Sequence, residues 1–150
     1  MIVMSLISRS FLSRIAARSP WLYRINAGSC NGCDVELATT AFLPRYDIER
    51  LGCQYCGSPK HADILLITGV LTARVKDKVL ALYEEVPDPK VTVAIGVCPI
   101  SGGVFRESYA VAGPFENYIP IDVNIPGCPP RPQAIIEGLQ KAIALWADRI

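Results

Sequence analysis

Two continuous and mainly apolar segments, residues 62–68 and 91–97, constrain the fold of this chain most strongly. Each is rich in Ile, Leu or Val and lacks the alternation of apolar and polar residues that marks a strand with one solvated face. Residues 72–85 lie between them, carry apolar side chains at the 3.6-residue period of a helix, and stop before the Pro-Asp-Pro turn at 87–89. This order predicts a βαβ unit with parallel strands that are buried on both faces.

The rest of the chain continues the alternation of strands and helices. We expect strands at residues 21–26 and 119–125, and helices at 34–42 and from 132 to the C-terminus. Strands that alternate with helices over a chain of 150 residues predict an open parallel sheet of the flavodoxin-like type, with helices on both faces. Residues 21–150 are accordingly predicted to form a single α/β domain.

The first 20 residues have a different pattern. Apolar side chains recur at helical spacing between arginines; they are Leu6, Ile7, Phe11, Leu12 and Ile15, with Arg9, Arg14 and Arg18 between or after them. Residues 1–20 are predicted to form an amphipathic helix that docks on a membrane arm or a partner. The alternatives are a helix packed on the domain's own sheet and a mitochondrial transit peptide, which this Ser- and Arg-rich start also resembles.

Charge and hydropathy narrow the class of protein. A formal net charge of +1 provides no field that would gather nucleic acid. Half of the residues are apolar, which favours a chain that lies against partners, but no run is long enough to span a bilayer, so membrane contact is expected to be peripheral. The arginines follow the first apolar residues instead of preceding them, so we expect no export, and six cysteines are then better explained as metal ligands than as disulfides.

Four of the cysteines are predicted to converge on one site. Cys30, Cys98 and Cys128 each lie just beyond the carboxyl end of a predicted strand, and these ends meet at one edge of an open parallel sheet. Cys33 follows Cys30 by three residues, so one tight loop delivers two thiolates. Four thiolates are the full complement of a 4Fe-4S cluster. The alternative without metal is four buried cysteines.

A second arrangement is a structural zinc site. Cys30 and Cys33 can be paired with Cys53 and Cys56, which have the same internal spacing and lie at a distance along the chain that is typical of such sites. That interpretation leaves Cys98 and Cys128 without a role. In the iron-sulfur interpretation, Cys53 and Cys56 are most simply buried small residues, although a redox pair or a second metal site stays open.

Several ordered motifs carry a family resemblance. They are Cys-Asn-Gly-Cys-Asp at 30–34, Pro-Arg-Tyr-Asp at 44–47, Gly-Ser-Pro-Lys-His-Ala-Asp at 57–63, Pro-Asp-Pro-Lys at 87–90, Ile-Gly-Val-Cys-Pro at 95–99, and Pro-Gly-Cys-Pro-Pro-Arg-Pro at 126–132. From about residue 21 to the last helix, the chain resembles the small subunit of membrane-bound, energy-converting NiFe hydrogenases. The cluster-carrying connecting subunit of respiratory complex I is homologous to that subunit.

The resemblance implies a function and a set of partners. Cys30, Cys33, Cys98 and Cys128 would bind one 4Fe-4S cluster that relays electrons between ferredoxin-type clusters and the NiFe catalytic subunit, in a complex that couples redox chemistry to ion translocation. The implied partners are that large catalytic subunit, a ferredoxin-like iron-sulfur subunit and an integral membrane subunit, at the cytoplasmic face of the cell membrane. The chain would then be a non-catalytic subunit of an oxidoreductase. The same role in a sulfur-reducing or complex I-like complex is the alternative.

Two further residues are candidates for proton coupling. Glu36 follows the first cysteine pair, and the resemblance to complex I suggests a proton relay there, although a carboxylate near a helix start is also explained by the helix dipole. His61 is the single histidine and could protonate in step with reduction. A structural or interface role is the simpler interpretation of His61.

Overall fold

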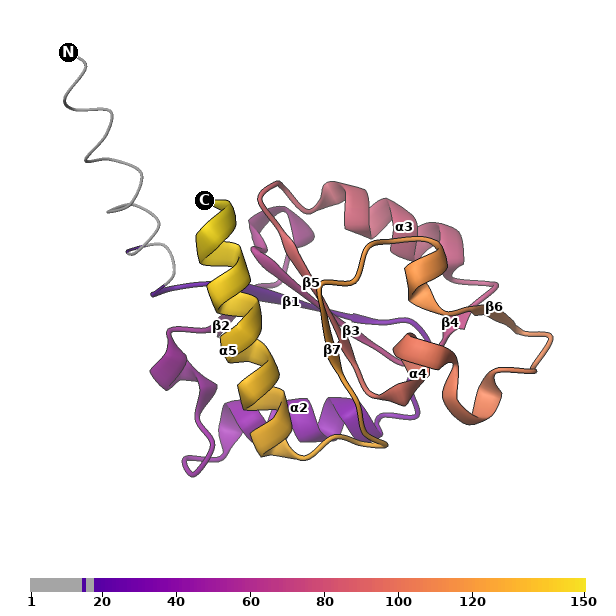
Figure 1. Cartoon of the computed structure of the whole chain (residues 1–150), viewed down its shortest axis with the longest axis horizontal. Helices are drawn as coiled ribbons and strands as arrows, with labels where there is room; N and C mark the ends of the chain where they lie inside the picture. The colour runs from indigo at the N-terminus through magenta and orange to yellow at the C-terminus, as the bar shows by residue number, and fades with distance from the viewer. Residues whose placement is uncertain (1–14, 16–17) are drawn as a thin grey trace, which may run out of the picture.

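The computed structural model describes residue 15 and residues 18–150 (Figure 1). At the centre of this described part lies a parallel sheet of five strands in the order β2-β1-β3-β5-β7. The strands are β1 (Trp21–Asn26), β2 (Gln54–Tyr55), β3 (Ile64–Thr68), β5 (Val91–Ile95) and β7 (Val123–Ile125). Counted along the chain, this is the order 2-1-3-4-5 of flavodoxin-like sheets. The predicted fold class is therefore confirmed.

The register of the sheet brings the ends of its strands to one level. β3 pairs along its whole length with β1 and β5, so that Asn26, Thr68 and Ile95 lie side by side at the carboxyl ends of the three strands. Ile125 of β7 is aligned with Ile95. The loops that follow β1, β3, β5 and β7 therefore leave the sheet at the same edge, as the sequence predicts.

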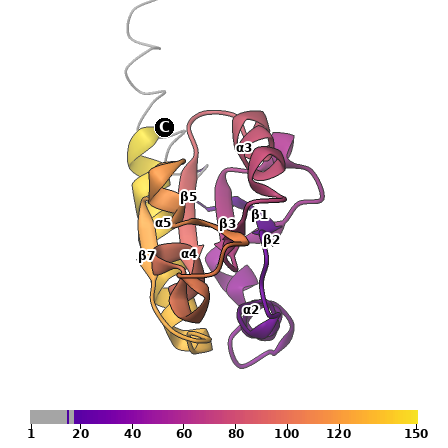
Figure 2. The same cartoon turned by 90° about the vertical axis from the view of Figure 1, so that its right-hand side faces the viewer.

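Helices cover both faces of the sheet. They are α2 (Gly32–Phe42), α3 (Lys76–Glu85), α4 (Val97–Ser101) and α5 (Pro132–Arg149), with short 3₁₀ segments at Ile48–Leu51, Pro59–His61, Gly103–Phe105 and Phe115–Asn117. Figure 2 shows α5 and α3 on opposite sides of the strands. Every residue of β3 and β5 is buried, as their continuous apolar sequences predict.

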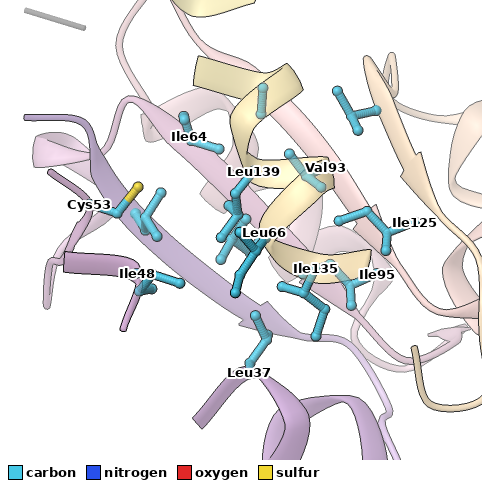
Figure 3. Close-up of a cluster of buried hydrophobic side chains, with 14 of the residues drawn as sticks. Leu37, Ile48, Cys53, Ile64, Leu66, Val93, Ile95, Ile125, Ile135 and Leu139 are labelled. Carbon is cyan, nitrogen blue, oxygen red and sulfur yellow. The ribbon is translucent and has the colours of Figure 1, made fainter. Parts of the chain in front are cut away.

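The two faces have separate apolar cores. On one face, Leu37 of α2 and Leu139 of α5 pack with Leu66 and Val93 of the sheet (Figure 3). On the other face, Val79 of α3 joins Leu65, Ile67 and Phe115. Full burial of a Leu or Ile side chain contributes about 1.5–3 kcal/mol, so the central strands, which place side chains in both cores, account for much of the stability of the fold.

Several elements differ from the predicted bounds, and three of the differences change the path of the chain. The helix predicted at 72–85 begins at Lys76, because Leu71–Thr72 form a short strand, β4, which pairs antiparallel with β6 (Val111–Gly113). β5 ends at Ile95, since Gly96 takes a positive φ and the chain turns into α4. The strand predicted at 119–125 is shorter and begins at Val123.

Nearly all of the amphipathic helix predicted for residues 1–20 lies outside the described residues, which leave out 1–14 and 16–17. Within the part of the chain that is described, no helix has both the length and the apolar character needed to cross a membrane.

Candidate metal centre

Four cysteines lie at the carboxyl edge of the sheet, each carried by a loop or helix that follows a strand. Cys30 lies between β1 and α2, Cys33 in the first turn of α2, Cys98 in α4 after β5, and Cys128 in the loop after β7. Cys30, Cys98 and Cys128 line one hollow of about 500 Å³, and Cys33 is buried and close enough for the charges of the other three to act on it. The structure thus brings together all four cysteines that the sequence singled out.

Glycines leave room for two of the thiols. A Cβ atom on Gly96 would lie 2.7 Å from Cys33 Sγ, and one on Gly103 would lie 3.4 Å from Cys98 Sγ. Gly96 also has φ 91° and ψ 169°, a backbone conformation that is essentially restricted to glycine. The Gly96 position therefore serves both the turn from β5 into α4 and the space that Cys33 occupies.

Backbone hydrogen bonds join the segments that carry Cys98 and Cys128. The N–H of Gly96 donates to the carbonyl oxygen of Ile125 at 2.8 Å, and the N–H of Val97 donates to that of Gly127 at 2.9 Å. These bonds extend the pairing of β5 and β7 beyond the sheet. They hold the start of α4 against the loop of Cys128, so the two thiols are placed by the backbone.

A buried carboxylate anchors the other pair of cysteines. Asp34 is 8% exposed and accepts hydrogen bonds from Arg24 Nη1 at 2.7 Å, from Asn26 Nδ2 at 2.9 Å and from Thr68 Oγ1 at 2.9 Å. Asn26 Oδ1 in turn accepts the backbone N–H of Ser29 at 2.9 Å, in the loop that leads to Cys30. Sequence reasoning missed this cluster, although a charged residue directly after Cys33 in a largely apolar helix was an available signal.

The electrostatics of the site favour a cationic occupant. Burial raises the pKa of the Cys33 thiol to about 11, and the negative charges of Cys98, Cys30, Asp34 and Cys128 act in the same direction. The pKa of Cys98 is also raised, first by burial and then by Cys128 and Cys30. Burial and the neighbouring charges therefore oppose ionisation of Cys33 and Cys98, whereas a bound metal core would stabilise both as thiolates.

The four thiols are not arranged as the ligands of a single metal ion. Among residue 15 and residues 18–150, no three His, Cys, Asp or Glu side chains lie close enough together to hold one metal ion. In a 4Fe-4S cluster each thiolate binds a different iron, so the sulfurs stand farther apart than the ligands of one tetrahedral ion. The three cysteines that line the hollow, with the buried Cys33 close to them, provide the four thiolates that such a cluster needs.

A zinc site shared by the two cysteine pairs does not fit the structure. Gln54 and Tyr55 pair with Trp21 and Leu22 at the start of β1, whereas Cys30 and Cys33 follow its end. The backbone N–H of Cys56 donates to the carbonyl oxygen of Leu22, so at about 3.3 Å per residue the rest of β1 separates Cys56 from the loop of Cys30 by roughly 10 Å. Zinc–sulfur bonds are about 2.3 Å long, so the two pairs cannot ligate the same ion.

Cys53 and Cys56 face opposite sides of the sheet. Cys53 is 1% exposed in the core beneath α5 (Figure 3), whereas Cys56 packs with the core of the other face. The Cys56 thiol donates to the carbonyl oxygens of Leu22 at 3.4 Å and Ser58 at 3.3 Å. Burial raises the pKa of both thiols. Their surroundings support the interpretation of both as packing residues and do not favour a redox pair.

The two candidates for proton coupling lie at different distances from the cysteines. Glu36 lies in α2, three residues after Cys33, and is partly exposed. His61 ends the 3₁₀ segment Pro59–His61 before β3, at the opposite edge of the sheet from the cysteine hollow, and is exposed. Proton coupling at either residue stays a prediction, and for His61 it would have to act across the length of β3.

Comparisons with known proteins agree with this fold. A family model described as NADH ubiquinone oxidoreductase, 20 Kd subunit, matches residues 30–142. The chain is 50% identical over 139 residues to the probable membrane-bound hydrogenase subunit mbhJ of Pyrococcus furiosus, covering 93% of this chain and 83% of that protein. It is 42% identical to formate hydrogenlyase subunit 7 of Escherichia coli, of which it covers 54%, so it spans about half of that relative's length.

Solved structures extend the comparison. A chain of the membrane-bound sulfane sulfur reductase, an archaeal respiratory membrane complex, superimposes with a TM-score of 0.79 at 34% identity, covering 93% of this chain and 76% of the other. A chain of an NAD⁺-reducing [NiFe]-hydrogenase superimposes with a TM-score of 0.65 at 19% identity, which shows that the two chains share a fold. The chain therefore belongs to the family of the NADH ubiquinone oxidoreductase 20 Kd subunit, whose relatives include subunits of membrane-bound hydrogenase, complex I and sulfur reductase complexes.

Proposed function

We propose that this chain is an electron-transfer subunit that holds one 4Fe-4S cluster on Cys30, Cys33, Cys98 and Cys128. The observation that carries the proposal is the convergence of four thiols, from three separate strand ends, at the carboxyl edge of the sheet, where three of them line one hollow and Cys33 is buried close to them. Such a cluster supplies one-electron redox chemistry when bound, and the protein sets its potential through charge, hydrogen bonds and solvent exposure.

The residues of the chain hold and shield the cluster. The pairing of Gly96 and Val97 with the β7 loop positions Cys98 and Cys128, while the Asp34 hydrogen bonds position the loop of Cys30 and Cys33. Burial of Cys33 restricts water on one side of the hollow. On the other side the hollow is open, which gives an electron-transfer partner close access.

An apolar rim beside the hollow supports a protein partner. Val104 is 91% exposed, Phe105 is half exposed, and both line the hollow with the cysteines. Large apolar side chains in such a position favour burial against another protein surface. We assign this rim to the large NiFe-type catalytic subunit, because contact there would bring the cluster close to the partner's active site.

The proposal also includes a ferredoxin-like donor subunit and an integral membrane subunit, with this chain held peripherally at the cytoplasmic face of the membrane. Relatives described as subunits of membrane-bound complexes support the membrane association. Coupling of electron transfer to ion translocation would then take place in the assembled complex. No catalytic residue is assigned to this chain, because the substrate chemistry would occur in the large subunit.

A sulfur-reducing complex is the second candidate. The sulfane sulfur reductase chain matches 93% of this chain with a TM-score of 0.79. The higher identity of 50% to the hydrogenase subunit favours hydrogen chemistry in the partner. Activity of the purified complex with protons or with polysulfide as the electron acceptor distinguishes the two.

The cluster itself is tested by metal analysis of the anaerobically purified chain. We expect a brown protein with about four irons and four sulfides per chain, as a 4Fe-4S cluster requires. Zinc without iron, or a colourless chain without metal after anaerobic reconstitution, would contradict the proposal.

A further inference from the structure

We propose that Asp34 is a positioning residue that shapes the Cys30–Cys33 ligand loop, and that its fixed negative charge lowers the reduction potential of the cluster. Arg24 is the matching positive charge, which raises that potential. This inference rests on the proposed function, because it concerns the cluster assigned to the four cysteines. It assigns a role to two residues that ligate nothing themselves.

The position of the carboxylate is determined from three sides. Arg24 and Asn26 belong to β1, Thr68 ends β3, and all three donate to Asp34 at 2.7–2.9 Å. The side chain of Asp34 is 7% exposed, whereas that of Arg24 is 43% exposed. Since a buried charge needs several partners to offset its lost hydration, the full set of donors is consistent with an ionised Asp34.

The hydrogen bond between Asp34 and Asn26 connects the carboxylate to the ligand loop. Because Nδ2 of Asn26 donates to Asp34, its Oδ1 must point the other way, where it accepts the backbone N–H groups of Gly28 at 3.1 Å and Ser29 at 2.9 Å. Ser29 Oγ then accepts the N–H of Asn31 at 3.0 Å. The loop that carries Cys30 is thus held in one conformation by a chain of bonds that begins at Asp34.

The charges of the pair act on the cluster with opposite signs. Reduction adds one negative charge, so a fixed carboxylate next to Cys33 opposes it and a fixed guanidinium favours it. Asp34 is buried and Arg24 is partly hydrated, so water screens Arg24 more strongly. The carboxylate therefore has the larger effect, and the net effect of the pair is a lower potential.

The test compares Asp34→Asn, Arg24→Gln and the double variant in the full chain, loaded anaerobically with iron and sulfide. Redox titration followed by EPR measures the midpoint potential of each. For Asp34→Asn we expect the ratio of reduced to oxidised cluster at a fixed potential to rise about tenfold, or about 59 mV for one electron. This is the size expected for a unit charge at about 10 Å in a medium of effective dielectric constant ~20.

The opposite shift is expected for Arg24→Gln, by about threefold, with the double variant between the two single ones. A purely structural role predicts something different, because either substitution would loosen the loop, admit water and shift both potentials in the same direction. Glu49→Gln, which removes an exposed carboxylate in the segment Ile48–Leu51, is the matched control and should leave the potential unchanged. Shifts of the same sign, or an Asp34→Asn potential equal to that of the control, would overturn the charge assignment.

Iron content separates this inference from the proposed function. A wild-type chain without a cluster would overturn both, whereas a loaded wild-type chain with unshifted variants would overturn only the role of Asp34 and Arg24. If Asp34→Asn alone fails to retain iron, the positioning role is supported, and the direction of the Arg24→Gln shift then decides the charge role. A raised or unchanged reduction potential in Arg24→Gln would overturn the charge role.

Discussion

Replacement of Gly96 by Ala should damage the site through two separate effects. The backbone there has φ 91° and ψ 169°, and a residue with a side chain in this region costs about 1–3 kcal/mol. The new Cβ would also lie 2.7 Å from Cys33 Sγ, whereas favourable contacts lie at about 3.5–4 Å, so the thiol would have to move by about 1 Å. We expect the free energy of unfolding of the iron-free chain to fall by about 2–4 kcal/mol.

Chemical denaturation of the iron-free chain measures the free energy of unfolding. The iron content per chain after anaerobic reconstitution measures whether Cys33 can still act as a ligand. Gly57→Ala is the matched control, because a Cβ on Gly57 would meet nothing within 4 Å and Gly57 has no positive φ. The control should retain full iron and wild-type stability to within about 1 kcal/mol. Full iron and control-like stability in Gly96→Ala would refute the reasoning that this position serves both the turn and Cys33.

Four further variants test the account. Cys98→Ala and Cys128→Ala should each lose or degrade the cluster, because a missing thiolate leaves one iron without its ligand; wild-type iron content and an unchanged reduced EPR signal would remove that residue from the ligand set. Cys53→Ala combined with Cys56→Ser should preserve the EPR signal, and its loss would connect these residues to the cluster. A chain that begins near Ser19 should fold and bind its catalytic partner but no longer fractionate with membranes; full assembly with the membrane arm would show that residues 1–18 are not the anchor.

The sequence predicts the central sheet well because its strands are buried on both faces. The continuous apolar runs at 62–68 and 91–97 have no other simple explanation, and they correspond to β3 and β5. The four cysteines follow from the same logic, since each lies after a strand and parallel strands end at one edge. Topology alone is therefore enough to bring Cys30, Cys98 and Cys128 together.

Other features depend on contacts between distant segments. β4 exists only because Leu71–Thr72 meets Val111–Gly113, and no local pattern at residue 72 distinguishes this strand from the start of a helix. Likewise, Arg24 and Asp34 are ten residues apart on different elements, and their ion pair forms because the loop of Cys30 folds α2 back along β1. The separate surroundings of Cys53 and Cys56 also require the register of β2, which places these residues on opposite faces.

Mössbauer spectroscopy of the ⁵⁷Fe-loaded full chain tests the central claim most directly, because it reports the type of iron site and its share of the total iron. We expect nearly all of the iron to show the signal of one thiolate-ligated 4Fe-4S cluster, at about four irons per chain. We also expect this signal to disappear in a chain whose Cys30, Cys33, Cys98 and Cys128 are all replaced by Ala. Iron that appears instead as isolated ions or as 2Fe-2S centres would contradict the account. A cluster signal that survives loss of the four cysteines would contradict it as well.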